Sequence, residues 1–151
     1  MVDADSIPVI AAGGIGDGRG LVAALALGAA GVQMGTRFVC TEECIAHANY
    51  KASIVRANER STLVTGTTIG HPVRCLRNPM SREFESMEKA GVDESQVIEF
   101  GTGRLQLAAM KGDVQNGTVM AGQISGLVHD VLPAAELIRR ISDEAEAVIA
   151  R

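Results

Sequence analysis

The sequence contains few of the residues on which several classes of protein depend. Tryptophan is absent, aromatic residues make up 3% of the 151 residues, and there are four prolines. Basic residues are not in excess, because 14 Lys and Arg stand against 18 Asp and Glu and the net charge is −4. This balance provides no electrostatic footprint for nucleic acid or for an anionic membrane surface, so we expect neither as a partner.

Long apolar runs are also absent. The stretch "IPVIAAGGI" near the N-terminus is too short and too rich in glycine to form a signal-peptide core or a membrane span. The three cysteines, Cys40, Cys44 and Cys75, form an odd set, which favours free thiols in a reducing cytoplasm. Cys40, Cys44 and His47 would share a face of one helix, but no fourth ligand is evident, so we predict no metal site.

The residues that are present suffice for one domain with a sizeable core. Hydrophobic residues make up 46% of the chain, and its 17 glycines gather in short motifs instead of low-complexity tracts. No internal repeat, linker or composition shift divides the chain. We therefore predict a single domain over residues 1–151.

Residues 8–35 predict a strand, a helix and a second strand. The runs "PVIAA" (8–12) and "GVQMG" (31–35) are short and continuously apolar, which is typical of strands buried on both faces of a parallel sheet. Between them lies an alanine-rich segment, 18–29, for which Asp17 is a suitable N-cap. Such a succession predicts a right-handed βαβ unit with parallel strands.

The remainder is expected to be mostly helical. Helices are predicted over 43–58, over 79–90 with proline in the first turn, across 103–112, and from Pro133 to the C-terminus. Residues 61–78 are less periodic and fit one or two short strands or an extended loop. The last helix is the clearest, because its apolar residues recur at spacings of three and four: Leu137, Ile138, Ile141, Ala145, Val148 and Ile149.

Glycine-marked turns follow both predicted strands. In parallel α/β folds, ligands bind beyond the carboxyl ends of the strands, and glycines there let backbone amides approach an anion. Gly13 and Gly14 would present amides from the first turn, and Gly35 and Thr36 from the second, with Arg37 as a counter-charge. The dipole of the helix after the first turn would add to the attraction of a phosphate.

Glycine at the end of a strand is also common without any ligand. The segment "GGIGDGRG" is neither a dinucleotide-binding fingerprint nor a P-loop, since "GK[ST]" is missing. Phosphate binding gains support because such turns follow two consecutive strands, as in (β/α)8 barrels that bind phosphate after strands seven and eight.

Five segments together resemble the carboxyl half of a known family: "IPVIAAGGIGDGRG", "LGAAGVQMGTRF", "GHPVR", "GDVQNGTVMAGQ" and "PAAELIRRI". They are similar, in order along the whole chain, to the nitronate monooxygenases (2-nitropropane dioxygenases). The segments "HPVR" and "VMAGQ" look closest to the branch that contains the FMN-dependent enoyl-acyl-carrier-protein reductases. The resemblance implies an α/β fold, namely strands 7 and 8 of an FMN-binding (β/α)8 TIM barrel with a mostly helical insertion.

The resemblance also implies roles for individual residues. The FMN phosphate would be held by Gly13, Gly14, Gly35 and Thr36, and the flavin pocket would be lined by Met120, Gly122 and Gln123. Residues 1–40 would form the phosphate-binding unit, residues 41–130 an insertion or lid, and residues 131–151 the final barrel helix.

The implied activity is flavin-mediated oxidation of nitroalkanes or nitronates. The alternative is reduction of an enoyl thioester, with NAD(P)H as electron donor. A complete barrel takes about 250 residues, and here only two barrel strands are predicted. In the family the catalytic histidine lies in the first six strands, so the catalytic residue is unknown in this chain; His47, His71 and His129 do not match it.

Three hypotheses follow from this shortfall. The chain is a truncated flavin oxidoreductase, or it is active as a homodimer or with a separate N-terminal half, or it is a non-catalytic module that keeps only the phosphate turns. For His71 and Arg74, a hydrogen bond that stabilises a loop is favoured over contact with an anionic substrate. Glu42 and Glu43 are expected to interact with a helix dipole.

Overall fold

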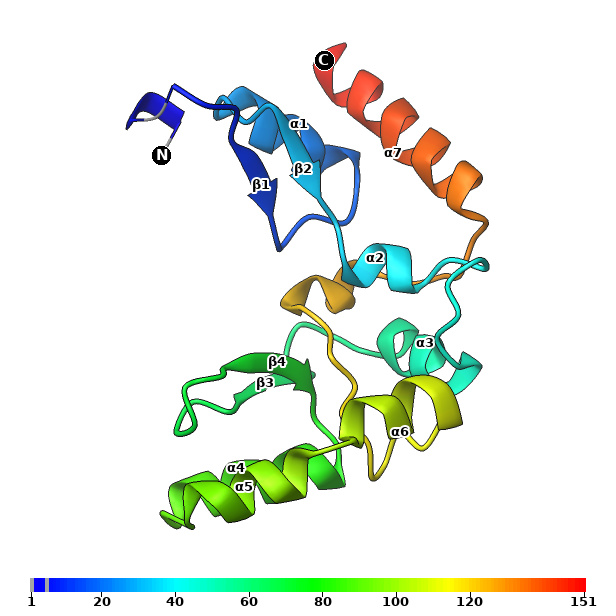
Figure 1. The fold of residues 1–151 in the computed structure, drawn as a ribbon. Coiled ribbons are helices and arrows are strands. Elements are labelled where there is room, and N and C mark those ends of the chain that lie inside the picture. The colour runs from blue at the N-terminus through cyan, green and yellow to red at the C-terminus, as the bar shows by residue number, and fades with distance from the viewer. Residues whose placement is uncertain (1, 5) are drawn as a thin grey trace.

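A computed structural model describes residues 2–4 and 6–151. A 3-10 turn, Val2–Ala4, precedes β1 (Ile10–Ala12), α1 (Gly18–Ala26) and β2 (Gly31–Gln33). Strands β1 and β2 pair in parallel, with Ala11 opposite Val32. The predicted strand–helix–strand unit with parallel strands is therefore confirmed (Figure 1).

Helix α1 begins where the sequence predicts. The Asp17 carboxylate accepts a hydrogen bond from the Gly20 amide at 3.0 Å, which is the expected N-cap geometry. The helix ends at Ala26, three residues earlier than predicted, and Gly28 follows in the left-handed conformation with φ +90°. A glycine in this conformation is the common way to end a helix.

The two-stranded sheet is covered on one face. Val32 lines a cavity together with Leu21 of α1 and Ile141 of α7 (Ala134–Ile149), so this face meets the helices. On the other face Ile10 is 53% exposed and Gln33 is also exposed. The prediction that both strands are buried on both faces is wrong for the described residues, because their helices pack on one side only.

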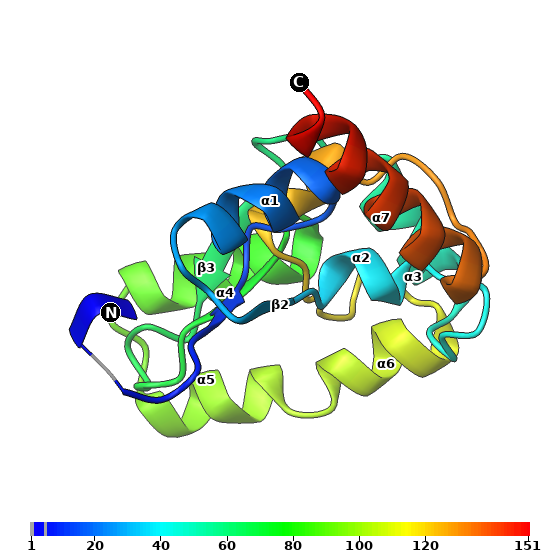
Figure 2. The same ribbon diagram turned by 90° about the horizontal axis from the view of Figure 1, so that it is seen from above.

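A second group of elements lies between β2 and α7 in the sequence. It comprises α2 (Thr36–Val39), α3 (Ala48–Val55), β3 (Thr62–Thr65), β4 (Val73–Leu76), α4 (Pro79–Lys89), α5 (Glu94–Gly101), α6 (Arg104–Lys111) and the 3-10 turn η2 (Gln123–Leu127). After η2 the chain returns to α1, so that α7 and α1 lie side by side (Figures 1 and 2).

The predicted helix over 43–58 is shorter than expected and begins at Ala48. The preceding residues pair with the segment that leads into α7: the Glu42 amide donates to the Leu132 carbonyl at 3.0 Å. From α3, the buried ammonium of Lys51 donates to the Thr41 carbonyl at 2.6 Å. These long-range bonds hold residues 41 and 42 against residue 132 and prevent an earlier helix start.

Strands β3 and β4 form an antiparallel hairpin, so the irregular region resolves into two strands. A third short segment joins it, because the Leu76 amide donates to the Val119 carbonyl at 2.8 Å and the Ala121 amide to the Arg74 carbonyl at 3.2 Å. Residues 119–121 therefore lie along β4.

Helices α4, α6 and α7 match their predicted positions, and α5 was not predicted. Asn78 and Ser81 form a capping box at the start of α4, with proline in the first turn. In α7 only part of the predicted apolar stripe is buried: Leu137 and Ile141 are covered, whereas Ile138 is 55% exposed.

The main core lies within residues 40–128. It is formed by Cys40, Tyr50, Ile54, Leu76, Ala108, Val119, Ala121 and Val128. Cys40, Cys44 and Cys75 are free thiols, as predicted, and burial raises the pKa of Cys40 to about 11. Within the described residues, no helix combines the length and the apolarity needed to cross a membrane.

Candidate functional site

The first glycine turn follows β1. Gly13 and Gly14 both have positive φ, +89° and +72°, so the turn needs glycine at both positions. A Cβ built at either residue would meet no atom within 4 Å, which means that the space before the turn is open. Among the described residues, neither backbone amide has a hydrogen-bond acceptor. The turn thus offers exposed, unpaired amides.

The second turn leaves the same edge of the sheet. Because Ala12 lies opposite Gln33 in the parallel register, the turns after β1 and β2 begin side by side. Gly35 has φ −91°, a conformation that any residue can adopt, so the backbone does not require glycine here. A Cβ at this position would nevertheless also meet no atom within 4 Å. Thr36 then opens the short helix α2. Phosphate sites in (β/α)8 barrels often combine these two loops with the start of a short extra helix.

Amides at the start of α1 are already paired with protein carboxylates. Its Gly18 amide donates to the Glu144 carboxylate of α7 at 2.9 Å, and its Gly20 amide is capped by Asp17. Burial opposes ionisation of Asp17, but hydrogen bonds from Gly20 and Arg19 outweigh it, so its pKa lies below the ordinary value. Two protein carboxylates therefore already accept from amides at the start of α1, and the attraction of a phosphate by the dipole of this helix stays a prediction.

Arg37 is not available as a counter-charge. Its side chain is 4% exposed, and its guanidinium lies 2.6 Å from the Asp130 carboxylate. The other Asp130 oxygen binds Arg140 of α7, also at 2.6 Å. Burial opposes ionisation of Asp130, but the hydrogen bonds from both arginines hold its pKa below its usual value. Arg37 thus fastens α2 to the segment before α7, and its predicted role at a phosphate is not supported.

The segment predicted to line the pocket lies against the second turn. The Gly122 amide donates to the Thr36 hydroxyl oxygen at 2.9 Å. This leaves the hydroxyl proton of Thr36 free to be donated to another acceptor. Met120 is 37% exposed, and Gln123 opens η2 with an exposed side chain. The structure therefore brings Thr36 and Gly122 together, and the flavin-lining role of Met120, Gly122 and Gln123 stays a prediction.

Tyr50 of α3 holds this segment in place, a role that the sequence did not reveal. Its hydroxyl donates to the Met120 carbonyl at 2.9 Å, and its side chain is 4% exposed. Burial raises the pKa of Tyr50 to about 12. One feature of the sequence could have drawn attention to Tyr50, since it is the only tyrosine of the chain.

Tyr50 gives a test of this arrangement through pH. Its folded pKa, about 12, is above the value of about 10 in an unfolded chain, so the folded state favours the neutral form. The contribution of neutral Tyr50 to the free energy of unfolding is complete below about pH 10 and is lost as the pH rises towards the pKa of Tyr50 in the folded state. We expect the tyrosinate absorbance of the native protein to appear near pH 12, and Tyr50→Phe to lower the free energy of unfolding by about 1–2 kcal/mol. A native titration midpoint near 10 would contradict the buried hydrogen bond.

The remaining candidate residues have structural partners. His47 accepts a hydrogen bond from the Asn49 amide and caps α3. The His71 amide donates to the Gly66 carbonyl and closes the hairpin loop, while Arg74 donates to the Thr62 hydroxyl. The Glu43 carboxylate accepts from the Ala134 amide, so it caps α7 and not the helix expected after it. No group of metal-ligating side chains occurs among residues 2–4 and 6–151.

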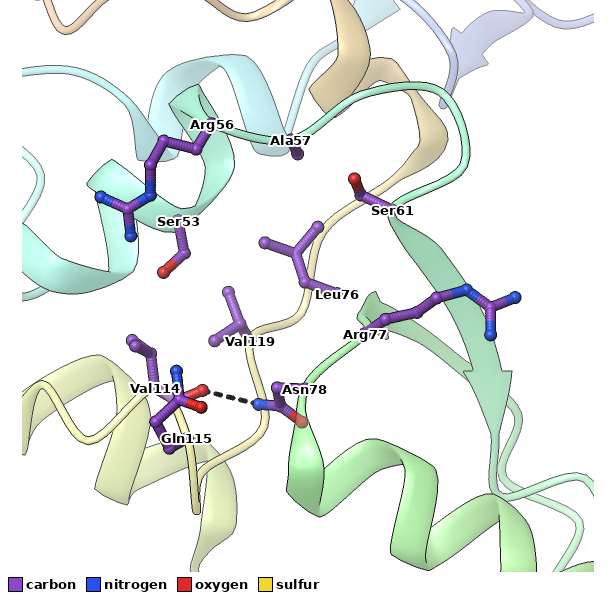
Figure 3. A pocket seen from close by; sticks show the side chains of 10 residues that line it. All are labelled: Ser53, Arg56, Ala57, Ser61, Leu76, Arg77, Asn78, Val114, Gln115 and Val119. Carbon is purple, nitrogen blue, oxygen red and sulfur yellow. Dashed lines mark hydrogen bonds between the residues drawn. The ribbon is translucent and has the colours of Figure 1, made fainter.

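A small cavity of about 160 Å3 lies among α3, the end of β4 and residues 114–119 (Figure 3). The Asn78 amide group donates to the carbonyls of Val114 and Gly117, both at 2.7 Å. The guanidinium groups of Arg56 and Arg77 point in different directions in Figure 3. Since its cations do not converge, we assign this cavity no ligand.

Comparison with known proteins identifies what the chain is similar to. The family model described as nitronate monooxygenase matches residues 1–144. A probable nitronate monooxygenase of Staphylococcus saprophyticus is 37% identical over 151 residues, which cover this whole chain and 42% of that relative.

Solved structures of similar proteins identify the fold. FabK from Thermotoga maritima superposes with a TM-score of 0.94 at 44% identity, covering 99% of this chain and 47% of that one. A nitroalkane oxidase from Streptomyces ansochromogenes gives a TM-score of 0.79 at 30% identity, covering 98% and 42%. The predicted α/β fold, a partial TIM barrel, is confirmed, and the chain spans less than half the length of the proteins that it matches.

Proposed function

This chain belongs to the nitronate monooxygenase family, and we propose that it forms part of an FMN-dependent oxidoreductase that acts on alkyl nitronates. In that enzyme it would provide the phosphate-binding turns and the insertion that covers the flavin. The observation that carries the proposal is the pair of open turns after β1 and β2, whose amides have no acceptor among the described residues.

The residues present fit the phosphate of FMN. Gly13 and Gly14 leave open space where any side chain would project, and Thr36 keeps a hydroxyl proton to donate. Backbone amides and a hydroxyl are typical donors to a phosphate, and among the described residues no carboxylate accepts a hydrogen bond from Gly13, Gly14, Gly35 or Thr36. These donors would hold the phosphate end of the cofactor, and Met120, Gly122 and Gln123 would lie towards its ring system.

When bound, the flavin supplies the electron-transfer chemistry, and the protein supplies orientation and a shaped environment. Residues of this chain would contribute in three ways. The glycine turns would fix the cofactor, the bond between Gly122 and Thr36 would set the distance between turn and insertion, and Tyr50 would orient the Met120 segment.

Enoyl-thioester reduction is the second candidate function, with NAD(P)H as electron donor. The likeness to FabK from Thermotoga maritima favours it, because its TM-score and identity exceed those to the nitroalkane oxidase. The name shared by the matching family model and the Staphylococcus relative favours nitronate oxidation. We therefore keep nitronate oxidation as the primary proposal.

We propose a cytoplasmic enzyme whose complete active site includes more polypeptide than the residues described here. The two-stranded sheet leaves one edge of β1 and one edge of β2 open, and these edges are suited to pairing with further strands, supplied by a second copy or by a complementary N-terminal half. The catalytic group is not assigned, because none of His47, His71 and His129 matches the position of the family's catalytic histidine.

The test is an assay of the purified chain with FMN, with and without a complementary N-terminal half of a family member. Oxidation of nitronates in the reconstituted sample supports the proposal. Reduction of an enoyl thioester without nitronate oxidation would establish the second function instead. If neither activity appears although FMN binds, the chain is a non-catalytic phosphate-binding module.

A further inference from the structure

An apolar cavity separates the β3–β4 hairpin from helices α4, α5 and α6. Its volume is about 380 Å3, larger than the cavity in Figure 3. Helix α4 lies along the hairpin in Figure 1. The apolar residues that line the cavity come from all of these elements and from the 119–121 segment: Ile69, Val73, Phe84, Val97, Ile98, Leu105 and Met120.

The three hydroxyl groups of the cavity wall already have partners. The hydroxyl of Thr102 donates to the Ile98 carbonyl at 2.7 Å, and that of Thr118 to the Met80 sulfur at 3.4 Å. The Thr65 hydroxyl lies 3.9 Å from the Cys75 sulfur. No Asp, Glu, Lys or Arg belongs to the wall, all of which lies in the described part of the chain, and His71 is its one titratable residue. A ligand would therefore find an apolar interior.

The cavity and the candidate site are linked along the chain, because Met120 lies in the cavity wall two residues before Gly122. The Gly122 amide donates to Thr36 at the second phosphate turn. The carbonyl of Met120 is fixed by Tyr50, so the wall between the turn and the cavity has a defined position. A molecule whose reacting end lies beside Met120 can extend its other end between the hairpin and α5.

We propose that this cavity binds the unbranched aliphatic tail of the substrate. The inference rests on the proposed function, because it takes the reacting head group to lie at the flavin. An engineered apolar cavity of about 150 Å3 holds one benzene ring, so a volume of 380 Å3 accommodates a tail of roughly fifteen carbon atoms by the same measure. The tail belongs either to an alkyl nitronate or to an acyl thioester, and both share this chemistry.

The proposal predicts how affinity depends on chain length. Each methylene that leaves water for an apolar wall tightens binding by roughly threefold to fourfold. We expect dissociation constants of linear nitronates, measured by calorimetry on the whole 151-residue chain, to fall steadily from four to about fifteen carbons and then to level off. Linear enoyl thioesters of the same lengths form the second arm, and the series with the steeper dependence identifies the source of the tail.

Two substitutions on one helix provide the mutational test. Leu105 of α6 lines the cavity and is 41% exposed, so Leu105→Trp fills part of the cavity while leaving the core intact. Met110 lies on the same helix, is 52% exposed and does not line the cavity, so Met110→Trp is the matched control. Circular dichroism establishes that both variants are folded.

We expect Leu105→Trp to weaken binding of the ligand with about fifteen carbons by about tenfold or more and to leave the binding of the four-carbon ligand unchanged. Met110→Trp should match the unmodified chain at every length. A flat dependence on chain length in the unmodified chain, or an equal loss in both variants, would overturn the proposal. These measurements are made with and without FMN, so failure of the tail site is distinguished from failure of the chain to bind flavin.

Discussion

Replacement of Gly14 by valine is expected to weaken FMN binding by at least about 30-fold, equivalent to about 2 kcal/mol. Gly14 has φ +72°, a conformation that a β-branched residue adopts only with strain. A valine would either move the turn out of this conformation, and with it the amides of Gly13 and Gly14, or fill the open space that the phosphate requires. Fluorescence quenching of FMN on titration with the variant measures the loss.

Gly91 provides the matched control for this prediction. It has φ +68°, a Cβ there would also meet no atom within 4 Å, and it follows α4, away from both glycine turns. Gly91→Val therefore introduces the same backbone strain without touching the candidate site. If both variants lost FMN affinity equally, or if Gly14→Val bound FMN like the unmodified chain, the assignment of the first turn would be wrong.

Replacement of Gly18 by alanine is expected to cause the largest loss of stability. A Cβ at Gly18 would lie 2.5 Å from the Ala145 amide nitrogen and 2.6 Å from the Ile141 carbonyl oxygen, both on the backbone of α7. These atoms cannot move without shifting the helix, so α1 and α7 must separate. The Gly18 amide would also lose its bond to Glu144. We expect the free energy of unfolding to fall by about 3 kcal/mol, which lowers the Tm by roughly 6–12 °C for a chain of this size.

Gly20→Ala is the control on the same helix. Its Cβ would approach the Ile15 side chain at 3.1 Å, a contact that a side-chain rotation relieves, and alanine favours the helix. We expect this change to alter the free energy of unfolding by less than about 1 kcal/mol. Urea denaturation of both variants measures the difference. Equal stability of Gly18→Ala and Gly20→Ala would show that the contact between α1 and α7 is looser than the structure indicates.

The sequence was sufficient to predict those helices whose ends are determined by residues close to them in the chain. Asp17 capping α1, proline in the first turn of α4 and the apolar spacing of α7 all correspond to observed helices. Long-range pairing decided the rest. The start of α3 was displaced because residues near Thr41 pair with Leu132, far away in the sequence, and no local pattern contains that information.

The candidate site, too, could be predicted from the sequence only where it depends on residues close together in the chain. The positions of the glycine turns followed from strand ends and from the parallel register, both of which are local properties. The partner of Arg37 is Asp130, 93 positions away, so a sequence motif that places Arg37 beside a turn could not reveal that its charge is used elsewhere. The carboxylate of Glu144 at the start of α1 is likewise 126 positions from Gly18. Partners of this kind become visible only when the helices are packed.

The central claim is that the turns after β1 and β2 hold a phosphate. The most direct test is a fluorescence titration of the purified 151-residue chain with FMN and, in parallel, with riboflavin, which lacks the phosphate. We predict that FMN binds at least about tenfold more tightly than riboflavin and that inorganic phosphate weakens FMN binding but not riboflavin binding. Equal affinities for the two flavins, or a chain that binds neither, would contradict the claim.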